Sequence, residues 1–429
     1  MQTNDNNNQV YPSILIIAYN FLPFFPSFGG VARAFYLYKV LKKSGYDTSI
    51  LSATGQPFGY FGHHNSISEG DVYYVRSYIN ESKTRLKSNN TKASRVWLHL
   101  ISFLKKLAQS LLIPDYSIID LFSFWKKLRS IVHDKNIQII IITVPKHGIS
   151  LIAIFAKFFY KHKVNIILDY RDSWNTQPIF CQTSFFGNII SRYFEKLVLN
   201  NIDYFTFVSP IVPKLIKTEL GIDLSNRSLL IYNGFDSSLG IRYRESNIIM
   251  GDKLKLMYIG SANDRLKSYR NVSFLFEYTI HNPNVYIDFY GELELTNHNL
   301  QQYPNISFKG SVPTNKLKEI SADYNWCIVL HTDKNSSREV IPGKFYDCIN
   351  LKLPVLCLAD QNSEVSQMVS RYNIGIVCNP SIKDILDNQH KLFDNDLLNL
   401  LNTNLTNDSL QLFERDNQLL KFLDIIKAI

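Results

Sequence analysis

The feature that most constrains the fold of this chain is an alternation between short apolar runs and segments of helical spacing. The run at 14–18 is continuously apolar, and a loop ending in two glycines separates it from residues 31–41, where apolar side chains recur at helical intervals. Continuous apolar runs are typical of parallel strands that are covered on both faces. Strands that alternate with helices predict a doubly wound α/β sheet.

The alternation continues through the first half of the chain and then starts again. Further strands are predicted at 48–51, 137–143, 164–168, 204–208 and 229–232, with helices at 150–160 and 189–199. A second series of apolar runs covers 254–260, 285–290, 306–309, 326–330, 355–358 and 375–377. A chain of 429 residues is long enough for two domains. We therefore predict an α/β fold of two doubly wound, Rossmann-like domains.

The boundaries of these domains follow from composition. We expect a disordered leader at 1–11, a first domain at 12–236, a polar hinge at 237–252, a second domain at 253–405 and a C-terminal helix within 406–429 that could pack back across the hinge. The five cysteines form no C-x-x-C pair and no zinc-like cluster. Cys327 and Cys357 lie in apolar runs, so we expect small core residues and a reducing compartment.

Charge is distributed unevenly along the chain. Residues 1–240 contain 26 Lys and Arg against 15 Asp and Glu, a net +11, whereas residues 241–429 contain 20 against 22, a net −2. A nucleic-acid surface, an anionic membrane and a solvated basic surface would each explain the excess. No nucleic-acid recognition motif is present, so we expect no nucleic-acid partner.

Two stretches bear on membranes. The start of the chain is polar, without the apolar core of a signal peptide, and no span is long enough to cross a bilayer. Residues 95–112 are apolar, basic and contain a tryptophan, which is typical of a membrane-interface helix, although a helix with a buried apolar face is the alternative. We expect a cytoplasmic protein, with peripheral contact to an anionic membrane through 95–112 as one interpretation.

A carboxylate pair lies in the segment E-V-I-P-G-K-F-Y-D at 339–347. Glu339 and Asp347 are eight positions apart, Lys344 lies between them, and a helical pattern and a buried strand follow. A carboxylate at a loop mouth can accept hydrogen bonds from sugar hydroxyls, and one in the next helix can accept them from a ribose. A lysine between the two can bind a diphosphate. Together these groups provide what binding of a nucleotide-sugar requires.

Two motifs in the first half directly follow predicted strands. The sequence D-Y-R-D-S-W contributes Asp169, Arg171, Asp172 and Trp174, and T-V-P-K-H-G contributes His147. Open α/β sheets bind ligands at the carboxyl edges of their strands. We expect the first motif to orient hydroxyls and a sugar ring, and His147 to bind a hydroxyl or carry a proton.

Glycines, an amide and basic residues supply the remaining candidates. Gly30, in the loop before the first helix, allows the backbone to approach a ligand, and Asn233 lies in an N-G-F-D turn at the end of the first domain. Arg265, Lys267 and Arg270 follow the glycine that ends the first strand of the second domain, where they could neutralise a diphosphate.

One D-x-D match, at 394–396, resembles a metal-bound nucleotide-sugar site but does not follow a strand. We therefore expect no bound metal.

In this order the motifs resemble family 4 glycosyltransferases of the GT-B fold, over nearly the whole chain from residue 14 to about 377. They are closest to a subset that carries D-[YF]-R-D-x-W, many of whose members build bacterial surface polysaccharides. The resemblance implies two domains that face across a cleft, with the donor on the second and the acceptor on the first. The family usually has Glu where Asp347 stands, and Asp is one methylene shorter.

The resemblance also implies roles for residues. Glu339 would hold the donor sugar, Asp347 the ribose, and Lys344 with Arg265, Lys267 or Arg270 the diphosphate. Gly30 would approach the phosphate. His147 and Asp172 would line the reaction centre, with Asp169, Arg171, Trp174 and Asn233 on the acceptor side.

The resemblance implies a retaining, metal-independent glycosyltransferase. It would need no cofactor beyond a nucleotide-sugar co-substrate, most plausibly a UDP-sugar, and its acceptor would be lipid-linked or a polysaccharide. A nucleotide-sugar 2-epimerase of the same architecture and a non-catalytic relative that binds a glycan or a partner are the alternatives.

Overall fold

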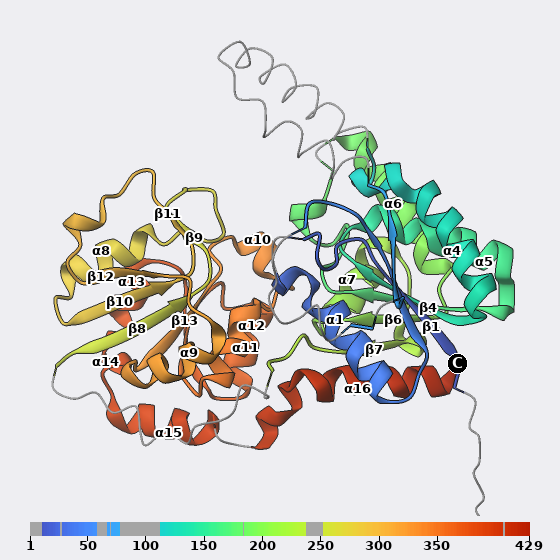
Figure 1. The fold of residues 1–429 in the computed structure, drawn as a ribbon. Coiled ribbons are helices and arrows are strands. Elements are labelled where there is room, and N and C mark those ends of the chain that lie inside the picture. The colour runs from blue at the N-terminus through green and yellow to red at the C-terminus, as the bar shows by residue number, and fades with distance from the viewer. Residues whose placement is uncertain are drawn as a thin grey trace, which may run out of the picture. The chain divides into compact units, whose positions relative to one another are not determined.

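The computed structural model describes residues 11–25, 28–57, 67–68, 70–77, 112–182, 184–236, 252–405 and 408–429. The predicted leader, nearly all of the predicted hinge and segment 95–111 lie outside these ranges. The chain divides into two compact units. The first comprises Met1–Val208, Val212–Ile231 and Leu419–Ile429, and the second comprises Ser209–Ile211 and Tyr232–Gln418. Helices and strands are named as in Figure 1.

The first unit is built on a parallel sheet with strand order β3-β2-β1-β4-β5-β6-β7. Its strands are β1 (Ser13–Ala18), β2 (Thr48–Ala53), β3 (Val72–Val75), β4 (Ile137–Val144), β5 (Asn165–Tyr170), β6 (Tyr204–Phe207) and β7 (Ser228–Leu230). Its helices are α1 (Phe28–Lys43), α4 (Leu121–Lys135), α5 (Ile152–Tyr160), α6 (Phe185–Asn200), α7 (Val212–Leu220) and most of α16 (Arg415–Ala428).

Each face of this sheet has its own apolar core, because successive strand residues point to opposite faces. Leu15, Ile17 and Leu168 pack with residues of α4, α5, α6 and α7, whereas Ile14 and Ile16 pack with residues of α1 and α16. Both sets are fully buried. The continuous apolar runs of the sequence therefore correspond to strands covered on both sides (Figure 1).

The second unit contains a parallel sheet with order β12-β10-β8-β13-β14-β15 and a small β9–β11 pair. Its strands are β8 (Leu254–Ile259), β9 (Ala262–Asn263), β10 (Val285–Tyr290), β11 (Leu293–Glu294), β12 (Ile306–Gly310), β13 (Trp326–Leu330), β14 (Val355–Leu358) and β15 (Gly375–Cys378). Its helices are α8 (Ser273–His281), α9 (Thr314–Ile320), α10 (Lys334–Ser337), α11 (Gly343–Asn350), α12 (Glu364–Arg371), α13 (Ile382–Asp387), α14 (Gln389–Leu392) and α15 (Asn395–Leu405).

Every strand predicted from the sequence is present, with ends that differ by at most two residues. The helix predicted within 406–429 is α16, and a 3-10 turn at Asp408–Phe413 precedes it. Cys327 and Cys357 are fully buried in the core, as expected, but Cys327 also forms a disulfide with Cys348 that the sequence did not predict. Among the described helices, none combines the length and the apolar character needed to cross a membrane.

Candidate functional sites at the carboxyl edges of the two sheets

In the second unit, the strand order reverses between β8 and β13. Successive strands β8, β10 and β12 lie on one side of this point, and β13, β14 and β15 lie on the other. Crossover helices leave opposite faces of the sheet here, which opens a crevice at the carboxyl ends where α/β proteins bind ligands. Gly260 follows β8 and His331 follows β13, so the loops that border this crevice begin at these two residues.

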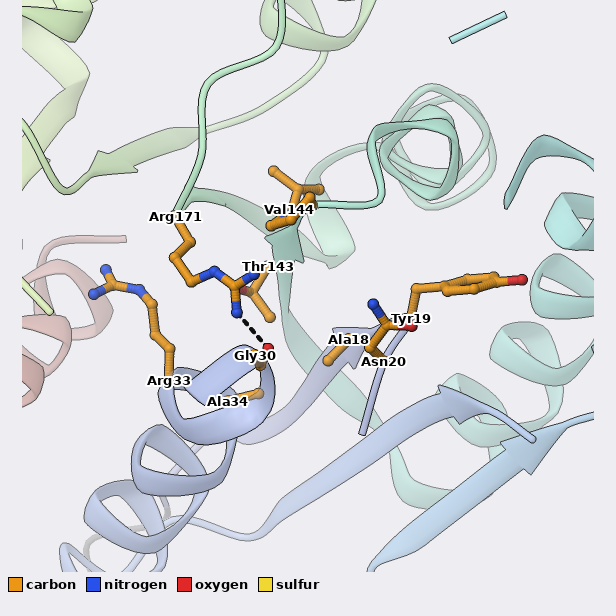
Figure 2. Close-up of a pocket in the computed structure, with 10 residues that line it drawn as sticks. Ala18, Tyr19, Asn20, Gly30, Arg33, Ala34, Thr143, Val144 and Arg171 are labelled. Atoms are coloured by element: carbon orange, nitrogen blue, oxygen red, sulfur yellow. Dashed lines mark hydrogen bonds between the residues drawn. The ribbon is translucent and has the colours of Figure 1, made fainter. Parts of the chain in front are cut away.

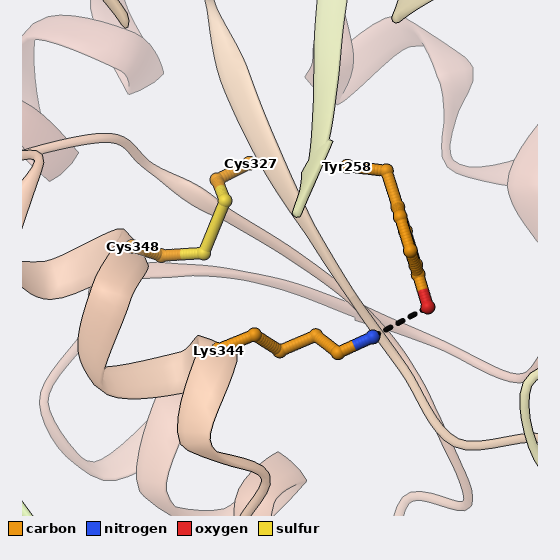
Figure 3. Close-up of a disulfide and its surroundings, with 4 residues drawn as sticks. All are labelled: Tyr258, Cys327, Lys344 and Cys348. Atoms are coloured by element: carbon orange, nitrogen blue, oxygen red, sulfur yellow. Dashed lines mark hydrogen bonds between the residues drawn. A yellow bond between two sulfur atoms is a disulfide. The ribbon is translucent and has the colours of Figure 1, made fainter. Parts of the chain in front are cut away.

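Lys344 reaches this edge from the first turn of α11. Its Nζ atom lies 2.5 Å from the hydroxyl of Tyr258 on β8 and 4.0 Å from the centre of the tyrosine ring. Figure 3 shows the lysine side chain extended from the helix toward that hydroxyl. A lysine at a helix N-terminus, beside free backbone N–H groups, is suited to an anionic ligand.

Arg270 adds a second positive charge beside Lys344. It hydrogen-bonds the hydroxyl of Ser261, just after β8, and its guanidinium lies 4.9 Å from the ring centre of Tyr269. Burial and the nearby Arg270 charge lower the pKa of Lys344 to about 7, with Asp347 acting in the opposite direction. Within the described residues, no carboxylate forms an ion pair with Lys344 or Arg270. The edge therefore carries positive charge that a bound anion would neutralise.

The other two basic candidates lie elsewhere on the same loop. Arg265 forms an exposed ion pair with Glu294, with a nitrogen–oxygen distance of 2.5 Å, and Lys267 is exposed. The carboxylate of Asp264, between them and β8, is buried and accepts hydrogen bonds from the backbone of Thr296, Asn297 and His298. Of the three basic residues, Arg270 is thus the one that the structure brings next to Lys344.

The carboxylate pair straddles the start of α11. Glu339 lies just before the helix and is 5% exposed, whereas Asp347 is half-buried one turn after Lys344, on the same face. Burial raises the pKa of Asp347 to about 6, although the positive charges of Arg415 and Lys344 act to lower it. Lys344 and Asp347 therefore share one face of α11, and Glu339 lies four residues before the helix.

Three groups at this edge were not predicted from the sequence. Tyr258 accepts the lysine contact, Ser261 binds Arg270, and the ring of His331 stacks on Tyr269 at 5.0 Å. Burial lowers the pKa of His331 to about 4, so the ring is neutral at pH 7. The sequence could have indicated each of them. Tyr258 lies at the end of a predicted strand, His331 directly follows one, and Ser261 and Tyr269 lie in the basic loop.

The disulfide fastens the helix that carries Lys344. Cys327 lies on β13 and Cys348 on α11, and their Cα atoms are 5.9 Å apart (Figure 3). Sequence spacing could not reveal this pair, because 21 positions separate the two cysteines. The bond ties the C-terminal half of α11 to β13, the strand that borders the crevice.

In the first unit, the strand order reverses between β1 and β4, and a pocket lies at that point (Figure 2). Its lining comes from the ends of the two strands, from the first turns of α1 and from the residue after β5. The lining residues are Ala18, Tyr19, Asn20, Gly30, Arg33, Ala34, Thr143, Val144, Pro145 and Arg171. Arg171 donates a hydrogen bond to the carbonyl oxygen of Gly30, so two of the predicted residues meet at this pocket.

Asp169 lies inside the sheet rather than on its exposed edge. It is fully buried and accepts two-pronged hydrogen bonds of 2.7 to 3.1 Å from Arg33. The hydroxyls of Thr143 and Thr206 complete its contacts at 2.9 and 2.7 Å. Burial opposes ionisation, but Arg33 and the two threonines hold the pKa of Asp169 below its usual range. The geometry gives Asp169 the task of fixing Arg33 at the pocket wall.

Trp174 is likewise buried. Its Nε1 donates to the hydroxyl of Ser191 at 2.9 Å, and that hydroxyl donates to the side-chain oxygen of Asn175. Glu195 of α6, also fully buried, accepts hydrogen bonds from Tyr170, at 3.0 Å, and from Asn175, at 2.7 Å. Trp174 thus anchors the D-Y-R-D-S-W loop to α6, which leaves Arg171 and Asp172 as its more exposed members.

His147 lies in an aromatic enclosure. Its ring stacks on Trp174 at 5.3 Å and meets Tyr170 and Phe180 edge-on. Neither ring nitrogen has a hydrogen-bond partner of normal geometry in the described part of the chain, although the backbone of Ser173 lies close. Burial lowers the pKa of His147 to about 4, against the charges of Asp115 and Asp172. The ring is 2% exposed, so it contacts a ligand only if the loop moves.

The N-G-F-D turn belongs to the second unit, and Asn233 is half-buried within it. Gly234 has a φ of +73°, and an added Cβ would lie 2.6 Å from the carbonyl oxygen of Phe413. The turn therefore packs closely against the segment before α16. The D-x-D match has a structural explanation, because Asp394 accepts hydrogen bonds from the backbone of Asp396 and Leu397 at the start of α15.

Known proteins resemble this chain in structure, at sequence identities of 12% or less, and such matches support the fold alone. No family model matches the chain, and no curated protein matches it in sequence. Sucrose-phosphate synthase from Thermosynechococcus elongatus matches in structure with a TM-score of 0.66 at 12% identity, over 97% of this chain and 98% of that one. WaaG, a glycosyltransferase of lipopolysaccharide biosynthesis, matches at 0.57 and 10%, over 97% and 100%.

The same architecture occurs outside the transferases. A Listeria monocytogenes protein described as a UDP-N-acetylglucosamine 2-epimerase matches with a TM-score of 0.52 at 9% identity, over 98% of this chain and 96% of that one. The matches extend over both units. The fold class predicted from the sequence, two Rossmann-like α/β units of the GT-B type, is confirmed.

Proposed function

We propose that the protein is a glycosyltransferase that moves a sugar from a nucleotide-sugar to a lipid-linked or polysaccharide acceptor. The observation that carries this proposal is the approach of Lys344 and Arg270 at the strand-order reversal of the second unit. A nucleoside diphosphate supplies the negative charge that these two groups lack. Glycosyltransferases and a UDP-sugar epimerase are among the proteins that share this fold, which supports a nucleotide-sugar as the ligand.

The chemistry assigned to the site is the departure of a diphosphate. As the bond between the anomeric carbon and the phosphate oxygen breaks, negative charge grows on the leaving group. Lys344, Arg270 and the N-terminal N–H groups of α11 are preorganised to stabilise it. Arg270 and the protonated form of Lys344 can do this without a metal, and metal-independent transfer with retention of configuration is part of the proposal.

Glu339 and Asp347 would bind the rest of the donor. The buried carboxylate of Glu339 suits the hydroxyls of the sugar, and Asp347, one helical turn beyond Lys344, suits the two hydroxyls of a ribose. On the first unit, the pocket beside Arg171 and Gly30 is proposed to bind the acceptor or the sugar that is transferred. In this scheme His147 and Asp172 line the reacting centre.

A binding experiment tests the diphosphate site. Calorimetry of UDP, GDP and dTDP with the intact protein identifies the base, and Lys344→Met and Arg270→Met should each weaken the best ligand. Loss of one charged hydrogen-bond donor, about 1.5 to 3 kcal/mol, should raise the Kd by about 10- to 150-fold. Lys383→Met, an exposed substitution on α13, is the matched control. Affinity that survives both substitutions would place the nucleotide elsewhere.

A turnover experiment separates the transferase from its rivals. Nucleotide-sugars are incubated with the protein, with and without membrane lipid extract. Release of nucleotide that depends on the extract supports glycosyl transfer, and conversion of the donor to its 2-epimer without transfer supports the epimerase. Absence of any nucleotide binding would identify a non-catalytic relative.

A further inference from the structure

Helix α6 presents an unusual face to solvent. Its N-terminal half exposes Phe185 and Phe186 at 75% each, Ile189 at 50%, Ile190 at 42% and Tyr193 at 58%. These positions recur at intervals of one, three and four, so they form one continuous stripe along the helix.

Over residues 185–195, the buried face of the same helix is more polar than the exposed one. Its buried residues there are Gly187, Ser191 and Glu195, and the last two bind Trp174 and Tyr170 of the D-Y-R-D-S-W loop. Val198 and Leu199 bury apolar side chains only near the end of the helix. A surface helix of a soluble domain normally turns its apolar stripe inward. The arrangement over residues 185–195 is therefore inverted, and the outward stripe needs a partner other than the core.

The neighbouring helix extends this surface. α5 contacts α6 and exposes Phe158 at 74% and Phe159 at 54%, with Phe155 beside them. The three are spaced as one outward stripe, and Phe155 and Phe159 pack on Trp125 of α4. Both helices pack on the same face of the first sheet and contact each other, so this face of the first unit exposes aromatic side chains from both. Exposed apolar surface on this scale marks an interaction site.

Basic residues border this surface. Lys161 and Lys163 follow α5, Lys196 lies on α6, and Arg129 of α4 is placed over the ring of Phe159 at 5.8 Å; all four are exposed. The half of the chain that contains these helices also carries the whole basic excess of the protein, a net +11 over residues 1–240. Aromatic and aliphatic side chains bordered by lysine and arginine fit an interface of apolar lipid tails and anionic headgroups.

We propose that the outward stripes of α5 and α6, with the bordering basic residues, form a docking surface for an anionic lipid bilayer. Phenylalanine rings insert at the level of the headgroups, and the lysines contact lipid phosphates. Because Trp174 and Asn175 are anchored to α6, the docked helix would hold the pocket edge of the first unit near the membrane surface. The inference stands apart from glycosyl transfer, since it rests on surface chemistry alone.

The test is sedimentation of the full chain with vesicles. Vesicles of phosphatidylglycerol with phosphatidylcholine are compared with vesicles of phosphatidylcholine alone. We expect binding to the anionic vesicles, and the triple variant F158S/F185S/F186S should bind at least about tenfold more weakly. The variant K163Q/K196Q should lose about fivefold per lysine, and more so at low salt. All five side chains are exposed, so circular dichroism should show unchanged folding.

Ile280→Ser is the matched control, because Ile280 is 61% exposed on α8 of the second unit. It should leave vesicle binding unchanged. Vesicle binding that the triple variant retains would overturn the proposal, as would equal binding to neutral and anionic vesicles. A wild-type protein that ignores vesicles but forms a dimer, which the triple variant breaks, would show that a second copy of the chain covers this surface. Neither result would affect the nucleotide-binding test of the proposed function.

Discussion

The buried carboxyl of Glu195 makes the stability of the first unit depend on pH. Burial raises its pKa to about 7 from an ordinary value of 4.5, against hydrogen bonds donated by Asn175 and Tyr170. A carboxyl whose pKa is raised in the folded state stabilises the fold fully below pH 4.5. This contribution is lost as the pH rises through 7. A difference of about 2.5 pKa units corresponds to about 3 kcal/mol.

The perturbation is Glu195→Gln. Glutamine keeps the shape of the protonated acid, and its amide can donate to the hydroxyl of Tyr170 while its oxygen accepts from Asn175. We expect the wild type to lose about 3 kcal/mol of unfolding free energy between pH 4.5 and pH 8 from this group, and the variant to lose none of it. At pH 8 the variant should therefore be the more stable protein.

The assay is urea unfolding at a series of pH values. Intrinsic fluorescence is a suitable signal, since Trp174 is anchored by the same network. Glu277→Gln, an exposed substitution on α8, controls for the loss of one charge. Parallel pH profiles for wild type and Glu195→Gln would refute the reasoning, because they would mean that Glu195 titrates alike in the folded and unfolded chain.

Four further outcomes follow from other contacts. In the protein without ligand the pKa of Lys344 is about 7, so binding of a nucleoside diphosphate at pH 8 should take up a proton. Calorimetry in buffers of different ionisation enthalpy measures this uptake, and its absence would mean that Lys344 does not contact the diphosphate. Gly234→Ala should destabilise the second unit by more than about 1 kcal/mol in thermal unfolding, since its φ is +73° and its added Cβ would meet the backbone of Phe413; an unchanged midpoint would contradict this. Trp174→Phe should cost about 1 to 3 kcal/mol, from the lost hydrogen bond to Ser191 and the lost packing, and should slow transfer only through the loop, so wild-type turnover would argue against anchoring. Thiol titration of the unfolded, unreduced protein should find three free cysteines, at 181, 357 and 378, and a count of five would exclude the disulfide.

The apolar runs and their helical partners were enough to determine two doubly wound α/β units. A strand covered on both faces is apolar at most of its positions, and this pattern is visible without a structure. The same apolar pattern showed that the motifs directly follow strands, so the positions of Gly260, His147 and Asp172 near the carboxyl ends of strands were predictable. Glu339, Lys344 and Asp347 were predictable as a group because they lie within a few turns of one chain segment.

Tertiary structure alone decided which members of each motif reach an edge. Asp169 and Trp174 are each two residues from a half-buried member of the motif, Arg171 or Asp172, yet a buried arginine and a buried helix face hold them inside. Arg270 lies beside Lys344, whereas Arg265 pairs with Glu294 of β11. The Cys327–Cys348 bond and the outward stripe of α6 also depend on contacts between segments distant in sequence, and local pattern carries no information about such contacts.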